Sequence, residues 1–280
     1  MNEIINYFNT IPTLHRALLL AGGISFFWLI ETAFPLYKFS YKKWHHAGIN
    51  IFFTVTTMIV NFFLAVILLK TAQWTVDNDF GLLHWLPKMN PWLFAIVGLL
   101  LLDLIGAYLV HLVEHKVRFL WHFHLIHHTD TWVDTTSANR HHPGESVVRF
   151  IFTTAGVLMV GAPMWMVFLY QTLSVVATQF SHANIVLPKK VDVFLSYFIV
   201  SPDMHKVHHH YVLPYTDSNY GNIFSVWDRL FGTFKTLDRD KIVFGIDTHM
   251  KPEEHNTLSN LLKIPFQKYR SSNSEAFEKK

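Results

Sequence analysis

Residues 92–115 read WLFAIVGLLLLDLIGAYLVHLVEH, an apolar run that ends in two histidines. The part from Trp92 to Val110 is long enough to cross a bilayer, whose core needs roughly 20 apolar residues per helix. His111 and His115 follow it and, being four residues apart, share one face of a helix. The stretch therefore predicts a membrane helix that brings two imidazoles to the membrane surface.

Three further stretches of the chain are similarly apolar. Leu14–Phe34 and Ile49–Leu69 each predict one membrane span. Phe150–Phe180 is too long for a single span and contains Gly161-Ala162-Pro163 at its middle, where proline removes a backbone donor and disfavours a continued helix. It predicts a helical hairpin that dips into the membrane and returns. The expected fold is an all-α integral membrane protein with three spans, one hairpin and a histidine-rich cap.

The composition agrees with this fold. Of the 280 residues, 51% are hydrophobic and only 15% are charged, whereas soluble domains are near a quarter charged. The absence of cysteine excludes disulfides and thiolate metal sites, so a metal must bind to His, Asp or Glu. The net charge of +3 comes from scattered Lys and Arg, which argues against a nucleic-acid partner.

The positive charges predict the orientation of the chain. The loop after the first span carries Lys38, Lys42 and Lys43, whereas the next loop carries Asp77 and Asp79. By the positive-inside rule the first loop is cytoplasmic, and by alternation so is the histidine-rich cap; in a bacterium the protein would lie in the inner membrane. We expect residues 1–250 to form one membrane-embedded domain and residues 251–280, rich in Lys, Glu and Ser, to form a polar tail.

Histidines are concentrated in one part of the chain. Thirteen of the nineteen lie in residues 111–210, where even spreading would put about seven. Residues 111–115 form one HxxxH pattern, and residues 124–128 and 205–209 each form HxxHH. On a helix, positions i, i+3 and i+4 lie on one stripe, so we expect each box to aim its imidazoles at a common point. Eight imidazoles suit two ions, and the nitrogen donors are compatible with iron, zinc or copper.

Two readings of this pattern remain open at this point. One is an enzyme that uses bound metal at the membrane face. The other is a metal-binding or metal-transport protein without oxygen chemistry, which should also carry ligands along a path through the hydrocarbon. Asp103, inside the third span, is a candidate to orient a metal-bound histidine, and the alternative is a polar residue used in helix packing.

Motifs outside the boxes complete an ordered set. Asp103, Tyr108 and the first histidine pair are followed by WHFHLIHH at 121–128, RHHPGE at 140–145, HAN at 182–184, PDMHKVHH at 202–209, DSNYG at 217–221 and WDRLFGT at 227–233. This set resembles the fatty acid hydroxylase/sterol desaturase superfamily, and in particular its compact bacterial members. The match runs from about Leu100 to Phe234.

The resemblance implies a membrane-bound di-iron oxygenase that acts on lipids. Its metal ligands would be drawn from nine histidines: His111, His115, His124, His127, His128, His182, His205, His208 and His209. Within the RHHPGE motif, His142 is a candidate for contact with a metal or with a ligand. His122, His141 and His210 are surplus to the boxes and are expected in a pocket or in solvent.

Other residues are candidates for supporting roles. The carboxylates of Glu145, Asp203 and Asp217 are candidates to orient ligating histidines, with simple solvation as the alternative. Tyr108 is a candidate to line the substrate pocket, or else an aromatic anchor at the interface. The remaining histidines lie far from the boxes, and we expect them to face solvent: His15, His45, His46, His84, His249 and His255.

The resemblance also implies the reaction and its partners. Two iron ions, or another divalent metal in the same sites, would use O2 and two electrons to hydroxylate or desaturate a C–H position of a lipid. The electrons would come from a separate donor, a reductase with a ferredoxin or a cytochrome. The sequence does not separate hydroxylation from desaturation, nor sterols, fatty acyl lipids, ether lipids and carotenoids as substrates.

Overall fold

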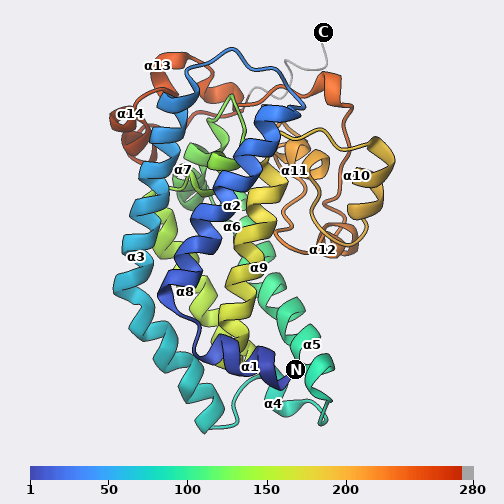
Figure 1. Cartoon of the computed structure of the whole chain (residues 1–280). Helices are drawn as coiled ribbons and strands as arrows, with labels where there is room; N and C mark the ends of the chain where they lie inside the picture. Colours follow the sequence, from blue (N-terminus) through green and yellow to red (C-terminus); the bar gives the residue numbers. More distant parts are fainter. Residues whose placement is uncertain (273–280) are drawn as a thin grey trace.

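Four helical stretches are long and apolar enough to cross a membrane. They are Thr13–Ala33, Lys43–Trp85, Pro91–Lys116 and Pro143–Val160. The computed structural model describes residues 1–272, and among these it contains helices and three isolated bridges but no β-strand. The all-helical membrane fold expected from the sequence is confirmed. Figure 1 shows the long helices side by side, with the shorter helices of the cap gathered toward one end.

The helices of the described chain are as follows. They are α1 (Asn2–Asn9), α2 (Thr13–Ala33), α3 (Lys43–Asp77), α4 (Leu82–Trp85), α5 (Pro91–Asp103), η1 (Leu104–Tyr108), α6 (Leu109–Lys116), α7 (Arg118–His128), η2 (Thr135–Asn139), α8 (Pro143–Val160), α9 (Met164–His182), α10 (Lys189–Leu195), α11 (Pro202–His208), α12 (Val226–Leu230), η3 (Arg239–Lys241), η4 (Asp247–His249), α13 (Pro252–His255), α14 (Leu258–Lys263) and η5 (Ile264–Phe266).

The third span is continuous from α5 through η1 into α6. It begins at Pro91, and the Asn90 side chain accepts hydrogen bonds from the backbone N–H groups of Trp92 and Leu93 at 3.1 and 3.0 Å. The turn η1 is π-helical, a local widening of the helix that is frequent near functional sites. It lies directly before α6 and therefore before the first histidine pair.

The hairpin expected around residue 161 is present as α8 and α9. The first helix ends at Gly161, whose φ of +73° lies in the left-handed region that glycine adopts without strain. Pro163 then precedes the first turn of α9, which runs back toward the cap. The chain after α9 therefore returns to the end where the histidine boxes lie.

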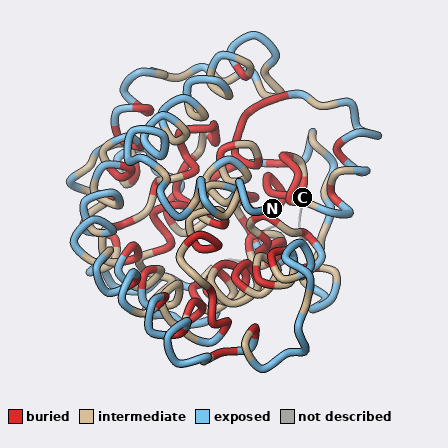
Figure 2. The backbone as a smooth tube through the Cα atoms, turned by 60° about the horizontal axis from the view of Figure 1, so that its bottom comes forward, coloured by how far each residue is buried: buried red, intermediate tan, exposed pale blue. Residues whose placement is uncertain are grey.

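The outer surface of the long helices is apolar. On α3, Phe62 and Phe63 are 76% and 75% exposed, and on α2, Leu29 is 73% exposed. Figure 2 shows that exposed residues lie on the outside of the bundle and buried ones toward its centre. Large exposed apolar side chains on long helices are those of a lipid-facing surface. The protein is an integral membrane protein.

The segment after residue 250 is part of the cap. Residues 252–266 form α13, α14 and η5, and Leu261 and Ile264 are buried against α7 and α3 in one apolar cluster. The backbone carbonyl of His255 accepts a hydrogen bond from Arg140 at 3.1 Å. The expectation of a polar tail from residue 251 is therefore wrong for this stretch, because its apolar residues pack against α3 and α7, which lie much earlier in the sequence. Residues 273–280 of that expected tail lie outside the described residues.

Candidate metal centre

The cap and the upper ends of the spans bring all nine candidate ligands together in two adjacent groups. Within each group, one nitrogen atom of every histidine lies within 4.8 Å of those of the others. The first group is His111, His115, His124, His128 and His208, and the second group is His127, His182, His205 and His209.

Helical geometry explains how the two HxxHH boxes are divided. On α7, His124 and His128 are four residues apart and share a face, so both join the first group, while His127 points to the second. At α11 the division is reversed, since His205 and His209 join the second group and His208 the first. The expectation that each box aims at one common point was wrong. Each HxxHH box instead contributes to both groups and fixes them next to each other.

Three imidazoles of the first group are oriented through their Nδ1 atoms. His111 Nδ1 donates to the backbone carbonyl of Tyr220 at 2.9 Å, and His208 Nδ1 donates to that of Ser218 at 2.6 Å. His124 Nδ1 donates to the Glu145 carboxylate at 2.8 Å. Because carbonyl and carboxylate oxygens only accept, the proton of each neutral ring is on Nδ1. The Nε2 atom of each ring therefore presents a lone pair to the group.

Two Nε2 atoms of the first group lie closer together than two uncharged lone-pair acceptors would without a cation between them. The Nε2 atoms of His111 and His124 are 3.1 Å apart, and both carry lone pairs. Two acceptors at this distance repel each other unless a cation lies between them. Nitrogens bound to one ion at about 2.1 Å lie roughly 3.0 to 3.4 Å apart. The first group therefore fits a metal ion.

The second group also contains Nε2 atoms that lie close together, and at least one of them carries a lone pair. His182 Nδ1 donates to the carbonyl of Thr178 at 2.8 Å, so its Nε2 atom carries a lone pair. That Nε2 atom is 3.0 Å from Nε2 of His205, and 3.2 Å from Nε2 of both His209 and His127. Four nitrogens with these spacings form a cage of the size that a first-row transition metal requires.

The protonation state of the cap histidines also suits metal binding. Burial lowers the pKa of His124, His128 and His209 well below its ordinary value, and neighbouring imidazoles lower it further. Burial likewise lowers the pKa of His208 to about 4. These rings are neutral at pH 7, and neutral imidazole is the form that ligates metals.

Glu145 lies where the sequence placed it, beside a candidate ligand. Its Oε1 atom accepts from His124 Nδ1, lies 2.8 Å from His141 Nδ1 and accepts from Arg149 Nε at 2.9 Å. Arg149 also donates to Glu114 at 2.6 Å, and Glu114 is a buried carboxylate that no sequence motif predicted. Glu145, Glu114 and Arg149 thus form a charged network beside the first group, in contact with His124.

The RHHPGE motif uses its two histidines differently from the expectation. His141, expected to be surplus, stacks on His127 with ring centroids 4.7 Å apart and bonds to Glu145. His142, the expected contact, instead caps α8, since its Nδ1 atom accepts from the backbone N–H of Gly144 at 2.9 Å. The expectations for these two histidines are corrected accordingly, because the backbone turn into α8 points His142 away from both groups.

Asp103 does not orient a histidine. Its carboxylate accepts hydrogen bonds from the backbone of Ile223 and Phe224, from Trp227 Nε1 and from Tyr170. These partners join the third span to α9, to the segment before α12 and to α12 itself. The expectation of a contact with a metal ligand is therefore wrong, since nearby backbone donors satisfy the acid. The role of Asp103 is to fasten the cap to the spans.

The other predicted supporting residues have different surroundings. Asp203 is paired with Arg239 at 2.7 Å rather than with a histidine, so that expectation is also corrected. Asp217 has an Oδ1 atom 3.9 Å from His115 Nδ1 and is also bonded to Lys116 and to the Tyr220 hydroxyl. Asp217 is therefore close enough to influence the first group.

A row of aromatic rings connects the first group with the surface. The Tyr220 ring centroid is 5.5 Å from that of His111 and 6.2 Å from that of Tyr108. Tyr108 stacks at 5.4 Å on Phe231, which is half exposed. Tyr108 is fully buried, and its hydroxyl is hydrogen-bonded to Thr233 at 2.9 Å.

Three histidines expected in solvent are buried. His46 Nε2 is 2.9 Å from the carboxylate of Asp130, and its Nδ1 atom is 3.3 Å from that of Asp134. His249 and His255 are each only 4% exposed. Their sequence positions gave no signal because the residues that cover them are far away in the chain. Of the other three, His15 and His45 are exposed, and His84 is partly buried against Gly161.

A buried arginine supports helix α7, and the sequence motifs did not predict this role. Arg140 is buried, and its guanidinium donates to the carbonyl of Ile126, to Asn50 and to Thr129. Burial lowers the pKa of this guanidinium, while Asp130 opposes that change. A basic residue directly before the histidine pair in RHHPGE was the available signal. These contacts hold the last turn of α7, which carries His127 and His128.

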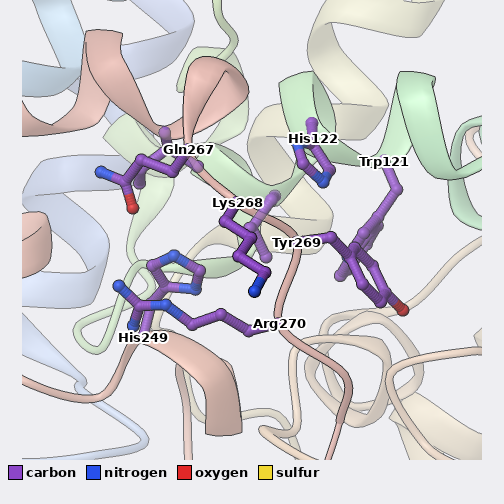
Figure 3. A pocket seen from close by; sticks show the side chains of 9 residues that line it. Trp121, His122, His249, Gln267, Lys268, Tyr269 and Arg270 are labelled. Atoms are coloured by element: carbon purple, nitrogen blue, oxygen red, sulfur yellow. The ribbon is translucent and has the colours of Figure 1, made fainter.

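Two cavities lie between α7 and the C-terminal segment. The small one, shown in Figure 3, has a volume of about 10 Å³, which is room for one water molecule, and is bordered by Trp121, His122 and Tyr269. The larger one has a volume of about 190 Å³ and reaches His115. The Trp121 ring borders both cavities and lies 4.8 Å from the His115 ring.

Known proteins resemble this chain over the same region. A family model described as fatty acid hydroxylase matches residues 95–233. An ornithine lipid hydroxylase from Rhizobium tropici is 26% identical over 56% of this chain and 46% of its own length. Alkylglycerol monooxygenases from Danio rerio and Homo sapiens are 29% and 28% identical over 56% and 59% of this chain, and 33% and 35% of their own lengths. No solved structure gives a significant match.

The matched regions cover less than half of each of these three relatives. The stretch that the family model matches begins within the third span and ends at Thr233, so it includes the first histidine pair, both HxxHH boxes and the residues that orient them. The order of the motifs, the two histidine groups and the match of the family model agree. The chain belongs to the fatty acid hydroxylase superfamily.

Proposed function

We propose that the two histidine groups hold two iron ions and that the protein inserts one atom of O2 into a C–H bond of a lipid. The observation that carries the proposal is the pair of facing lone pairs in the first group, on Nε2 of His111 and His124. The family supports it, and so do relatives named as lipid hydroxylases and monooxygenases. Bound iron would supply the activation of O2 and the one-electron steps that side chains cannot perform.

The ligands divide as the groups do. We assign the five histidines of the first group to one ion and the four of the second group to the other. Both donor sets consist of imidazole nitrogens, which suit iron, and the bound ions would supply the redox chemistry of O2.

The protein orients these ligands through their outer nitrogens. In the first group, the carbonyls of Tyr220 and Ser218 and the carboxylate of Glu145 fix the Nδ1 proton of one ring each. In the second group, the carbonyl of Thr178 does the same for His182. Such contacts fix the tautomer and make the ligating nitrogen more basic. Arg149 pairs with both Glu145 and Glu114 and offsets part of their negative charge beside the first group.

The balanced reaction is R–H + O2 + 2 e⁻ + 2 H⁺ → R–OH + H2O. The electrons come from a separate one-electron carrier, a ferredoxin or cytochrome with its reductase. Removal of a second hydrogen, with both oxygen atoms leaving as water, would give an alkene instead. Hydroxylation is the proposed outcome, since the relatives named above are hydroxylases and monooxygenases.

The lipid chain approaches from the bilayer along the aromatic row. Phe231 is exposed beside the third span, and Tyr108 and Tyr220 follow it toward His111. Tyr108 and Tyr220 are buried and their hydroxyl groups are bonded to Thr233 and Asp217, so the remaining surface along this row is apolar. The arrangement favours a chain that enters sideways from the membrane.

The cap faces the cytoplasm in this proposal. The loop with Lys38, Lys42 and Lys43 lies at the cap end, whereas Asp77 and Asp79 lie at the opposite end of α3. This orientation would place the metal centre within reach of soluble electron carriers. The transport alternative has less support, because the mid-span carboxylate of Asp103 is fully used in fastening the cap.

The test of this function is an isotope experiment. Purified protein loaded with iron would be given a chemical or enzymatic reductant, extracted membrane lipids and ¹⁸O2, and the lipids analysed by mass spectrometry. We expect one ¹⁸O atom in a new hydroxyl group. A desaturated product without label would select the alkene outcome, and unchanged lipids across lipid classes, with iron bound, would contradict the proposal.

A further inference from the structure

Helix α10 is amphipathic, but its polar side faces the protein and its apolar side faces outward, the reverse of a helix at a water-exposed surface. Asp192 and Ser196, which directly follows the helix, are buried, and Asp192 accepts hydrogen bonds from Ser201 and from the backbone of Asp203. On the outer side, Phe194 is 64% exposed and Phe198, just beyond the helix, is 61% exposed. The sequence thus places apolar side chains outward and polar ones inward.

Helix α12 also buries an acidic residue and exposes apolar ones on its outer side, although one apolar residue is buried with the acid. Trp227 and Asp228 are buried, and Asp228 accepts hydrogen bonds from the backbone N–H groups of Tyr220 and Gly221. Leu230 on the outer side is 67% exposed. Outward-facing Leu and Phe on two neighbouring cap elements form an apolar surface that water would oppose.

The two elements are joined into one surface. An antiparallel bridge links Ile199 with Phe224, and the Ser225 hydroxyl donates to the carbonyl of Ser196 at 2.6 Å. Arg229 lies over the ring of Tyr197 at 5.0 Å. We define the apolar patch as Phe194, Tyr197, Phe198, Val226, Leu230 and Phe231, all of which are exposed.

The apolar patch continues the surface of the third span. In Figure 1, α12 lies level with the middle of α9, so it is beside the spans rather than above them. Phe231 stacks on Tyr108, which belongs to η1 in the third span. Lys189 and Lys190 are exposed at the start of α10, where cations meet lipid phosphates.

We propose that the apolar patch is a membrane-contact surface, with Phe194, Phe198 and Leu230 immersed in the bilayer at the boundary between headgroups and acyl chains. Its occupant is lipid rather than a second protein, because the patch is continuous with a membrane span and is flanked by lysines. Apolar and aromatic side chains gather at this depth in membrane proteins. The contact also holds Phe231, the outer end of the aromatic row, in lipid.

The natural chain is suited to a direct test because it has no cysteine. Single-cysteine variants Phe194→Cys, Phe198→Cys and Leu230→Cys would carry a nitroxide label in full-length protein reconstituted into liposomes. Phe62→Cys, on the exposed face of α3, is the lipid control, and Glu253→Cys, exposed on α13, is the water control. Power-saturation electron paramagnetic resonance compares the collisions of each label with O2, which concentrates in lipid, and with a water-soluble nickel chelate.

We expect the ratio of O2 collisions to nickel collisions at the three patch positions to exceed that at residue 253 several-fold and to approach that at residue 62. Nickel collisions as frequent as at residue 253 would overturn the proposal. Exclusion of both reagents at all three positions would also overturn it, since the patch would then be covered by protein. A helical circular dichroism spectrum equal to that of the unchanged protein verifies folding, and the test needs no bound metal or activity.

Discussion

His111 and His124 face each other across 3.1 Å through Nε2 atoms that both carry lone pairs, because their Nδ1 protons are committed to Tyr220 and Glu145. The two residues lie on different helices, α6 and α7, which meet at a sharp turn around Val117. The fold therefore holds two acceptors in contact, an arrangement that a cation stabilises and that an empty site does not.

Removal of one ligand should disable the centre without preventing membrane insertion. We expect His128→Ala and His205→Ala, one from each group, to lose at least one bound iron per chain and essentially all activity. The measurement is iron content and product formation in protein purified from membranes. His45→Ala, at an exposed position, is the control and should retain both. A fully active His128→Ala variant would refute the ligand assignment.

Loss of the charge on Glu145 should weaken the first site selectively. Glu145→Gln replaces the carboxylate that accepts from His124 Nδ1, and such losses typically reduce metal affinity about 10- to 100-fold. Competition with a chelator measures the affinity of each site. The matched control is Asp203→Asn, which removes a carboxylate paired with Arg239 away from both groups. Equal effects of the two substitutions would show that Glu145 has no special role.

The metal-free protein should lose stability in mild acid. The folded-state pKa of His208 is about 4, below the unfolded value of about 6.5, and burial also holds the pKa values of His124, His128 and His209 well below the unfolded value. The unfolded chain therefore binds more protons, and the free energy of unfolding falls as pH drops from about 6.5 toward 4. Thermal unfolding of the metal-free protein between pH 5 and pH 8 tests this expectation. A Tm that does not change over this range would contradict it.

Asp103 should matter for stability although it touches no ligand. Its carboxylate receives four donors, so Asp103→Asn would turn an amide N–H toward other N–H groups at the joint between cap and spans. We expect a loss of about 1–3 kcal/mol, seen as a lower Tm in detergent. Asp77→Asn, exposed at the far end of α3, should leave Tm unchanged. An unchanged Tm for Asp103→Asn would show that the joint does not depend on this carboxylate.

Local patterns predicted the parts of the structure that depend on neighbours in the chain. The lengths of the apolar stretches predicted the spans. Gly161-Ala162-Pro163 predicted the hairpin, because a proline and a glycine with positive φ end or start a helix at their own positions. Histidine spacing and the ordered motifs gave the nine candidate ligands. Their division between two groups depends on how α7 and α11 are rotated against each other, which spacing within one helix does not encode.

The failures came from contacts between distant residues. His46 was expected in solvent, yet its partner Asp130 is 84 positions away. Asp103 was assigned to a histidine, whereas its donors are 67 to 124 positions away, on α9 and before and within α12. A buried charge in a span predicts that a partner exists, but the identity of that partner is set by tertiary packing.

The central claim is that the two histidine groups bind two redox-active irons. The most direct test is elemental analysis together with Mössbauer spectroscopy of protein purified from cells grown with ⁵⁷Fe. The proposal predicts two irons per chain that are reduced to the ferrous state and reoxidised by O2. A single tightly held zinc, or no bound metal even after iron loading, would contradict it.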